Sequence, residues 1–175
     1  MSQSAVTAFI TLNLLAFVSL LIWAALSDFL SFKIPNIISI LLVVFYFIAL
    51  VPFNFDFLQL VSNLSTAAGM LAICFLLFIR GYIGGGDAKL LTAISLWTGL
   101  ESLSTFIFFT TLSGGGIALL LIGFRYFDLP VKLKRIYFIK QLYDEKTFVP
   151  YGIAIASGAL VTLDDILVFS PLWED

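Results

Sequence analysis

The sequence predicts an all-α, polytopic membrane protein with six transmembrane helices. Hydrophobic residues make up 61% of the 175 residues and charged residues only 11%, whereas a soluble domain carries roughly 25% charged residues. The mean hydropathy is +1.11. Charged, proline and glycine positions divide the chain into six apolar runs, and the basic residues fall in alternate loops. Together these observations are typical of a chain built for lipid.

Each of the six apolar runs approaches the roughly 20 residues that a helix needs to cross a hydrocarbon core about 30 Å thick. The first run has no preceding Lys or Arg and is longer than a signal-peptide core, so we expect a retained helix. We expect one membrane-embedded domain over residues 1–175 with a single long loop, 125–147. The expected helices are approximately 5–26, 37–53, 57–79, 84–99, 103–124 and 148–163.

The charged residues that bound the fourth run are closer together than those of any other run. A helix from Asp87 to Glu101 rises only about 20 Å. A re-entrant segment is the alternative. It would place the six basic residues of loop 125–147 on the side opposite Lys33 and Arg80, so the charge pattern favours a true span. To reach across, this helix must begin near residue 84, which draws Asp87 toward the membrane.

With six spans, all nine Lys and Arg residues lie on one side. Lys33 is in the first loop, Arg80 and Lys89 flank the third, and the other six are in loop 125–147. The remaining loops and both termini carry only acids. By the positive-inside rule the basic loops are cytoplasmic and both termini lie outside, in a multi-pass protein of the cytoplasmic (inner) membrane.

Membrane lipids are the partners expected from two surface features. Loop 125–147 alternates apolar and basic residues, a pattern that anionic lipid can hold at the interface. Trp23, Trp97 and Trp173 lie near expected helix ends, where tryptophan commonly forms an interfacial aromatic belt.

The residue inventory excludes several classes of function. The few, scattered charges form no face for nucleic acid. Cys74 is the single cysteine and histidine is absent, so we expect no disulfide framework and no zinc site. We expect no metal or other cofactor, and any chemistry is left to carboxylates, hydroxyls, lysine or tyrosine.

Asp28 and Asp87 are the two cytoplasmic-side acids that abut apolar helices rather than lying in the long loop. Such residues are costly in a membrane and are candidates for function. Two adjacent carboxylates cannot both ionise, so one can hold a proton while the other activates water. The alternative is helix capping, by Asp28 near Ser31 and by Asp87 at the helix that follows it. Topology alone leaves both interpretations open.

The residues before Asp87 favour the catalytic interpretation. Gly84, Gly85 and Gly86 place three residues without side chains before a carboxylate at a helix start, where backbone can adopt positive φ and a substrate can approach closely. A second triplet, residues 114–116, lies within the fifth expected helix, where we expect it to serve packing.

These residues resemble a known family. Gly84-x-Gly86-Asp87-x-Lys89-Leu90 resembles the GxGD motif of membrane aspartyl proteases, in the GxGDxKL form of the prepilin peptidases. Asp28, followed by Ile34-Pro35-Asn36, is similar to the segment that carries that family's first catalytic aspartate. The resemblance implies that Asp28 and Asp87 are the catalytic pair.

A third match is Pro150-Tyr151-Gly152 with Gly158, which is similar to the family's C-terminal P-[FY]-G-x-A pattern. The three motifs stand in family order and span essentially the whole chain. Lys89 either meets an acidic residue of the substrate or anchors the helix end, and Asn36 either bonds near the site or caps a helix. The candidates for the motif and substrate groove are Gly84, Gly86, Lys89, Asn36, Pro150 and Gly152.

The resemblance implies an aspartic endopeptidase that cleaves type IV pilin-like precursors, each with an N-terminal hydrophobic helix, at the cytoplasmic membrane face. Larger family members also methylate the new N-terminus and carry an insert with paired cysteines between their first helices. Here the loop 27–35 is too short for that insert and Cys74 stands alone. We therefore expect cleavage without methylation, as in the small peptidases of tight-adherence (Flp-type) pilus systems or the archaeal preflagellin peptidases.

Two other functions fit a strongly hydrophobic chain with two acidic residues beside apolar helices. A small proton-coupled transporter or channel component could use Asp28 and Asp87 as a proton relay, although such acids more often lie midway along helices. A non-catalytic assembly factor would tolerate Asp→Asn at both positions.

Overall fold

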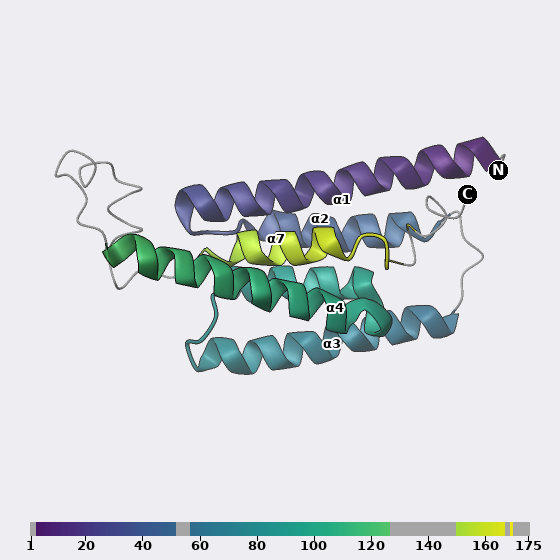
Figure 1. Cartoon of the computed structure of the whole chain (residues 1–175). Helices are drawn as coiled ribbons and strands as arrows, with labels where there is room; N and C mark the ends of the chain where they lie inside the picture. The colour runs from purple at the N-terminus through teal and green to yellow at the C-terminus, as the bar shows by residue number, and fades with distance from the viewer. Residues whose placement is uncertain (1–2, 52–56, 127–149, 167–168, 170–175) are drawn as a thin grey trace.

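The computed structural model describes residues 3–51, 57–126, 150–166 and 169. They form helices that lie lengthwise beside one another (Figure 1). Residues 3–51 form α1 and α2, residues 57–126 form α3 and α4, and α7 follows. The bounds are α1 Gln3–Ser31, α2 Asn36–Ala49, α3 Phe57–Ile79, α4 Gly85–Tyr126 and α7 Tyr151–Val161. No strand occurs among these residues, so the predicted all-α class is confirmed.

Three of the described helices are long and apolar enough to cross a membrane by length and composition, namely α1, α3 and the part of α4 over Gly85–Gly123. The prediction of six full-length spans is therefore not confirmed. Two of the expected helices, 84–99 and 103–124, are joined as α4. Two others are short, because α2 has 14 residues and α7 has 11.

Gly99 divides α4 into a first arm, residues 85–98, and a second arm, residues 100–126. Its backbone has φ 61° and ψ −169°, a conformation that is essentially restricted to glycine. In Figure 1 the ribbon of α4 reverses direction at this point. The sequence thus predicted a break between the expected helices 84–99 and 103–124. Because the chain reverses at Gly99, α4 consists of two antiparallel arms.

Two helix ends differ from the predicted bounds. In α1 a polar residue did not end the helix, and in α2 a proline ended the helix earlier than expected. α1 continues past Leu26 to Ser31, because Asp28 finds a buried partner and Pro35 is the first helix-breaking residue. α2 ends at Ala49, shortly before Pro52, which disfavours helical conformation in the residue that precedes it. Residues 127–149, most of the predicted loop 125–147, lie outside the described residues.

Trp97 forms the centre of the packed core. Its ring lies 4.7 Å from that of Phe17, 5.4 Å from Phe169 and 5.6 Å from Tyr46. The indole Nε1 donates to the Leu42 carbonyl over 3.0 Å, which satisfies the one polar atom of the ring. The interfacial position predicted for Trp97 is wrong: only 1% of it is exposed, since the reversal at Gly99 turns it into the bundle.

Helix α7 packs closely against both α1 and α4. The backbones of α1 and α4 are less close to each other among the described residues, and these two helices meet through side chains such as Phe17 and Trp97. Small residues allow the close approach. A Cβ on Gly158 would overlap Thr110 and lie 3.0 Å from the Phe106 carbonyl oxygen. A Cβ on Gly114 would lie 3.2 Å from the Tyr151 ring. One residue of the second glycine triplet therefore serves packing, as expected.

Replacing Gly99 with alanine tests the reversal. The new Cβ would lie 2.6 Å from Asn63 Oδ1, in a backbone conformation that costs of order 1–3 kcal/mol for other residues. We expect Gly99→Ala to lower the thermal unfolding midpoint in detergent. Gly115→Ala, in the helical second arm with nothing within 4 Å of its Cβ, is the matched control and should be neutral or slightly stabilising. Equal midpoints for both variants would contradict this account.

Candidate active site

Asp28 lies in the last turns of α1 with only 6% of its surface exposed. Its Oδ2 accepts the backbone N–H of Gly152 over 2.6 Å. The hydroxyl of Ser31, by contrast, donates to the Ser27 carbonyl over 2.6 Å. Asp28 therefore binds the start of α7, a contact with a distant part of the chain in addition to any local capping near Ser31.

The fit at Gly152 requires glycine. A Cβ there would lie 2.7 Å from Cβ and 2.9 Å from Oδ2 of Asp28, closer than real Cβ contacts allow. Pro150 is buried and precedes the first residue of α7, and proline is well suited to a helix start because its missing N–H needs no partner there. The predicted motif residues Pro150 and Gly152 thus set the position at which α7 meets Asp28.

Asp87 lies in the first turn of α4 and is half-buried. Its carboxylate accepts the backbone N–H of Gly84, the residue just before the helix. This is the reciprocal half of a capping box, in which a side chain at the third helical position satisfies the N-cap amide. Negative charge here also complements the helix dipole. The capping interpretation of Asp87 is correct, and it is compatible with a second role.

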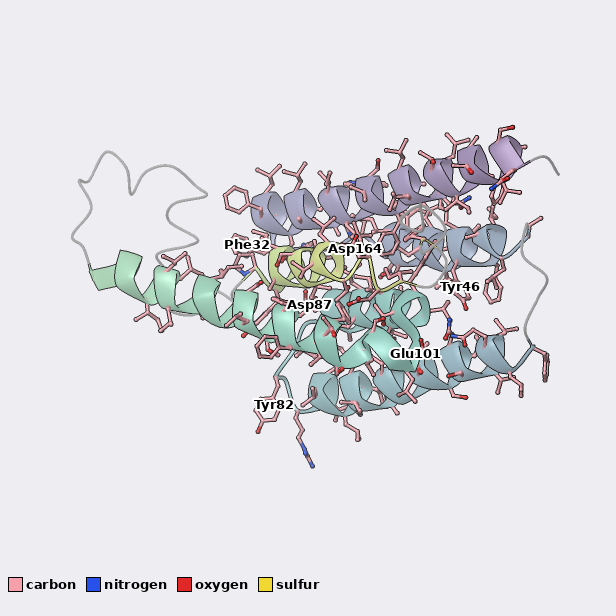
Figure 2. All side chains as sticks on the ribbon, turned by 45° about the vertical axis from the view of Figure 1, so that its right-hand side comes forward. Phe32, Tyr46, Tyr82, Asp87, Glu101 and Asp164 are labelled. Carbon is pink, nitrogen blue, oxygen red and sulfur yellow. The ribbon has the colours of Figure 1, made fainter. Side chains whose placement is uncertain are left out.

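Asp28 and Asp87 line one pocket of about 340 Å³, which we call the aspartate pocket. Figure 2 shows Asp87 and Phe32 toward one end of the bundle, with Tyr46 and Glu101 toward the other. The remaining lining residues are Phe32, Lys33, Ile34, Gly84, Gly85 and Gly86.

The glycine run forms one wall of the aspartate pocket because it has no side chains. A Cβ on Gly84 would lie 2.8 Å from Oδ2 of Asp87, and one on Gly86 would lie 3.2 Å from Cβ of Ile34. A side chain at either position would push against the carboxylate or against the opposite wall. Neither of these two glycines adopts the positive φ that their sequence allowed, and the close approach of a substrate stays a prediction.

The opposite wall contains Phe32, which no sequence motif indicated, and Ile34, which was expected only as part of the Ile34-Pro35-Asn36 motif. Phe32 is the one non-glycine residue with positive φ, 53°, in the described part of the chain, and its N–H donates to the Asp28 carbonyl over 2.8 Å. Ile34 packs on Gly86. Their position in the sequence could have indicated that Phe32 and Ile34 line the pocket. Both lie in the short connection between Asp28 and Pro35, which must stay near the carboxylate.

Lys89 and Asn36 come together, but neither lines the aspartate pocket. The Lys89 ammonium donates to Asn36 Oδ1 over 2.9 Å, so these two candidates join the first turns of α4 and α2. Of the predicted site residues, the structure gathers Asp28, Asp87, Gly84, Gly86 and Gly152 at one place.

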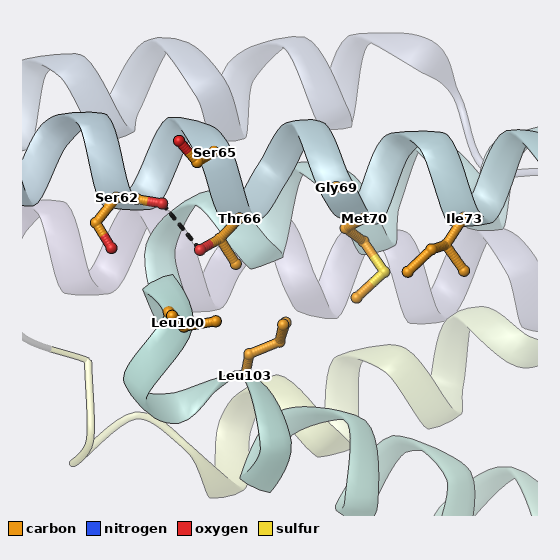
Figure 3. Close-up of a pocket in the computed structure, with 8 residues that line it drawn as sticks. All are labelled: Ser62, Ser65, Thr66, Gly69, Met70, Ile73, Leu100 and Leu103. Atoms are coloured by element: carbon orange, nitrogen blue, oxygen red, sulfur yellow. Dashed lines mark hydrogen bonds between the residues drawn. The ribbon is translucent and has the colours of Figure 1, made fainter.

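A second pocket of about 320 Å³ lies between α3 and the second arm of α4 (Figure 3). Thr66 Oγ1 bonds the Ser62 carbonyl over 2.9 Å, and Ser65 Oγ bonds the Val61 carbonyl over 2.7 Å. These hydroxyls are satisfied by their own helix, so the pocket offers mainly apolar surface and no ionisable group. Its lining is Ser62, Ser65, Thr66, Gly69, Met70, Ile73, Leu100 and Leu103.

Within the residues that the structure describes, no group of three or more His, Cys, Asp or Glu side chains is placed to hold a metal ion. The aspartate pocket has two carboxylates and one lysine as its ionisable groups. Two carboxylates that share a pocket suit proton transfer to and from water and a carbonyl.

A family model described as the type IV leader peptidase family matches residues 15–119. This range is more than half of the chain and contains Asp28, Asp87 and the whole aspartate pocket. The chain belongs to the type IV leader peptidase family. It is accordingly a peptidase of the membrane, with three apolar helices long enough to span.

Comparisons with curated proteins and with solved structures found no match. The family match ends at residue 119, before α7. The hydrogen bond from Gly152 to Asp28 therefore comes from a part of this leader peptidase beyond the matched range.

Gly152→Ala tests the contact between α7 and Asp28. The added methyl group should displace the carboxylate, and misplacing a reacting group by about 1 Å can cost on the order of 100-fold in rate. We expect peptidase activity to fall by about 10- to 100-fold with the protein still folded. Gly69→Ala on α3, with nothing within 4 Å of its Cβ, is the control. Normal activity of Gly152→Ala would show that this contact does not position Asp28 for the reaction.

Proposed function

We propose that this peptidase is an aspartic endopeptidase that removes the leader peptides of type IV pilin-like precursors at the cytoplasmic membrane face, without methylating the product. Asp28 and Asp87 are the catalytic pair. One observation supports the proposal above the others: two carboxylates from helices far apart in the sequence line a single pocket of about 340 Å³.

The reaction needs one proton shared by the pair. The ionised carboxylate takes a proton from water as the water oxygen attacks the scissile carbonyl carbon, while the protonated carboxyl gives its proton to the carbonyl oxygen. The resulting tetrahedral diol then breaks its C–N bond as the nitrogen accepts a proton from the carboxyl that took one from water. At the same time one hydroxyl of the diol gives its proton to the other carboxylate, which forms the product carboxyl group and restores the shared proton of the pair. Each step uses only the two side chains, the peptide and water.

Substrate access is the reason for assigning the reaction to one membrane face. The pocket walls are the connection between α1 and α2 and the glycine run before α4, and both belong to the loops that carry Lys33 and Arg80. By the positive-inside rule this end is cytoplasmic. An extended peptide can approach the glycine wall closely, and the substrate's hydrophobic helix then continues into the bilayer.

The proposed topology keeps six crossings, with both termini outside and the basic loops inside. The reversal at Gly99 supports counting the two arms of α4 as separate crossings. The first arm, α2 and α7 are shorter than a typical span, so these crossings depend on their neighbours in the bundle.

We propose that the product is not methylated because the segment between α1 and α2 is very short. Only residues 32–35 separate these helices, which leaves no room for the insert that larger relatives carry there. Mass spectrometry of the processed product should give an unmodified N-terminus.

Separate Asp28→Asn and Asp87→Asn substitutions test the catalytic pair. Asparagine keeps the shape but cannot exchange a proton with water or substrate, so each variant should lose cleavage of a co-expressed pilin-type precursor by at least about 100-fold. The measurement is the ratio of processed to unprocessed precursor in membranes at equal peptidase levels. Full processing by either variant would refute the assignment of Asp28 and Asp87 as the catalytic pair. Proton flux in liposomes that depends on Asp87, without cleavage, would instead favour the transporter alternative.

Activity should follow pH through two ionisations and should not require a divalent metal. Two interacting carboxylates titrate as a pair with two apparent values, and activity should be highest between them, where one proton is present. We expect a bell-shaped dependence of kcat/KM on pH, unchanged by EDTA. Loss of activity with EDTA that a divalent cation restores would contradict a carboxylate-only reaction.

A further inference from the structure

Lys89 and Asn36 are predicted site residues to which the reaction described above gives no role. Both are exposed, and both lie outside the lining of the aspartate pocket. The Lys89 ammonium donates to Asn36 Oδ1 over 2.9 Å, across 53 positions of sequence. Asn36 is the first residue of α2, and Lys89 is the second residue after Asp87 on α4. This hydrogen bond therefore joins the starts of two helices at the edge of the site.

The chain that follows Asp28 stays close to the start of α4 before it reaches Asn36. The Phe32 N–H donates to the Asp28 carbonyl over 2.8 Å, which keeps the connection near the first aspartate. Ile34 then packs on Gly86, where an added Cβ would lie 3.2 Å from the Ile34 Cβ and 3.4 Å from its carbonyl oxygen. The backbone of this connection thus contacts the residue that immediately precedes Asp87.

The Lys89–Asn36 bond supplies a second contact on the other side of Asp87. Gly86 precedes this aspartate and Lys89 follows it, so the segment that begins at Asp28 holds the first turns of α4 at two points. Helix α2, which this segment starts, packs against both α1 and α4. The two aspartates are therefore linked by a short route that does not pass through α7.

The helix that carries Lys89 does not by itself explain a lysine at this place. Lys89 is the fifth residue of α4, and the helix dipole favours cations at the opposite end of a helix. A hydrogen bond from an ammonium is stronger than one between neutral groups, so it can hold two exposed side chains together. The contact with α2 is the interaction that this lysine adds to the fold.

We propose that Lys89 and Asn36 are a pair of positioning residues whose hydrogen bond fixes Asp87 relative to Asp28. The proposal rests on the proposed endopeptidase function, in which the two carboxylates share one proton and act on one water molecule. Neither member of the pair touches the peptide. Both act through the aspartates, whose separation must stay constant because small displacements of reacting groups slow a reaction strongly.

The test measures kcat and KM for a pilin-type precursor with purified peptidase in detergent, with kcat referred to the folded enzyme. Asn36→Ala removes the acceptor and Lys89→Met removes the donor, and both new residues are good helix formers. We expect kcat to fall by about fivefold to twentyfold in each variant, because the reacting groups are less well placed. KM should stay within about twofold, because no contact with the peptide is lost.

A double variant separates the hydrogen bond from the individual side chains. Asn36→Ala combined with Lys89→Met should lose no more kcat than either single change, because the second substitution has no bond left to break. Lys89→Arg keeps a cationic donor and should retain most of the kcat. Arg80→Met removes an exposed basic residue from the loop before the glycine run and should match the wild type, which controls for the loss of a positive charge.

Three results would overturn the proposal: unchanged kcat in Asn36→Ala or Lys89→Met, even with a lower thermal unfolding midpoint; a rise in KM that accounts for the whole loss; or losses that multiply in the double variant. Failure of the proposed function is distinguishable. It would appear as no cleavage by the wild type or as full cleavage by Asp28→Asn or Asp87→Asn, and the positioning role would then be refuted with it.

Discussion

The hydrogen bond from the Gly152 amide to Asp28 Oδ2 is the interaction on which the arrangement of the site depends. α1 and α4 carry the two aspartates, their backbones make few close approaches, and α7 packs against both. The 2.6 Å bond, together with the absence of a side chain at Gly152, fixes α1 to the start of α7. Gly158 lets the same helix approach the second arm of α4. The aspartate pocket is thus held by a helix that contributes no side chain to its lining.

A second constraint is the reversal of α4 at Gly99. It places the first arm, with Asp87 at its start, beside the rest of the bundle and turns Trp97 into the aromatic core. The Leu42 carbonyl accepts the Trp97 indole, and Asn63 bonds the Tyr46 hydroxyl over 2.9 Å beside Gly99 itself. The Trp97 indole and the Tyr46 hydroxyl are therefore both paired, and the position of Asn63 leaves no room for a side chain at Gly99.

Composition and local pattern predicted the all-α class, the break near residue 99 and the two aspartates, because each depends on residues adjacent in sequence. They did not predict that Gly152 meets Asp28, since 124 positions separate the two and a glycine amide leaves no mark on sequence pattern. The length of α1 was also missed, because a buried partner for Asp28 removed the reason for the helix to stop. The same limit applies to the lysines: sequence spacing favoured Lys89, and only tertiary structure shows that Asn36 occupies it while Lys33 borders the aspartates.

The short length of α2 has a consequence for the surrounding lipid. Its 14 residues rise about 21 Å, less than the hydrocarbon thickness of about 30 Å, and side chains such as Ile40 and Phe47 remain exposed along it. Hydrophobic mismatch of this kind is relieved by local thinning of the bilayer or by polar flanks that extend to the interface. In the proposed topology, local thinning would bring the headgroup region toward the start of α2, next to the aspartates. Water would then reach the proposed catalytic pair without a channel through the protein.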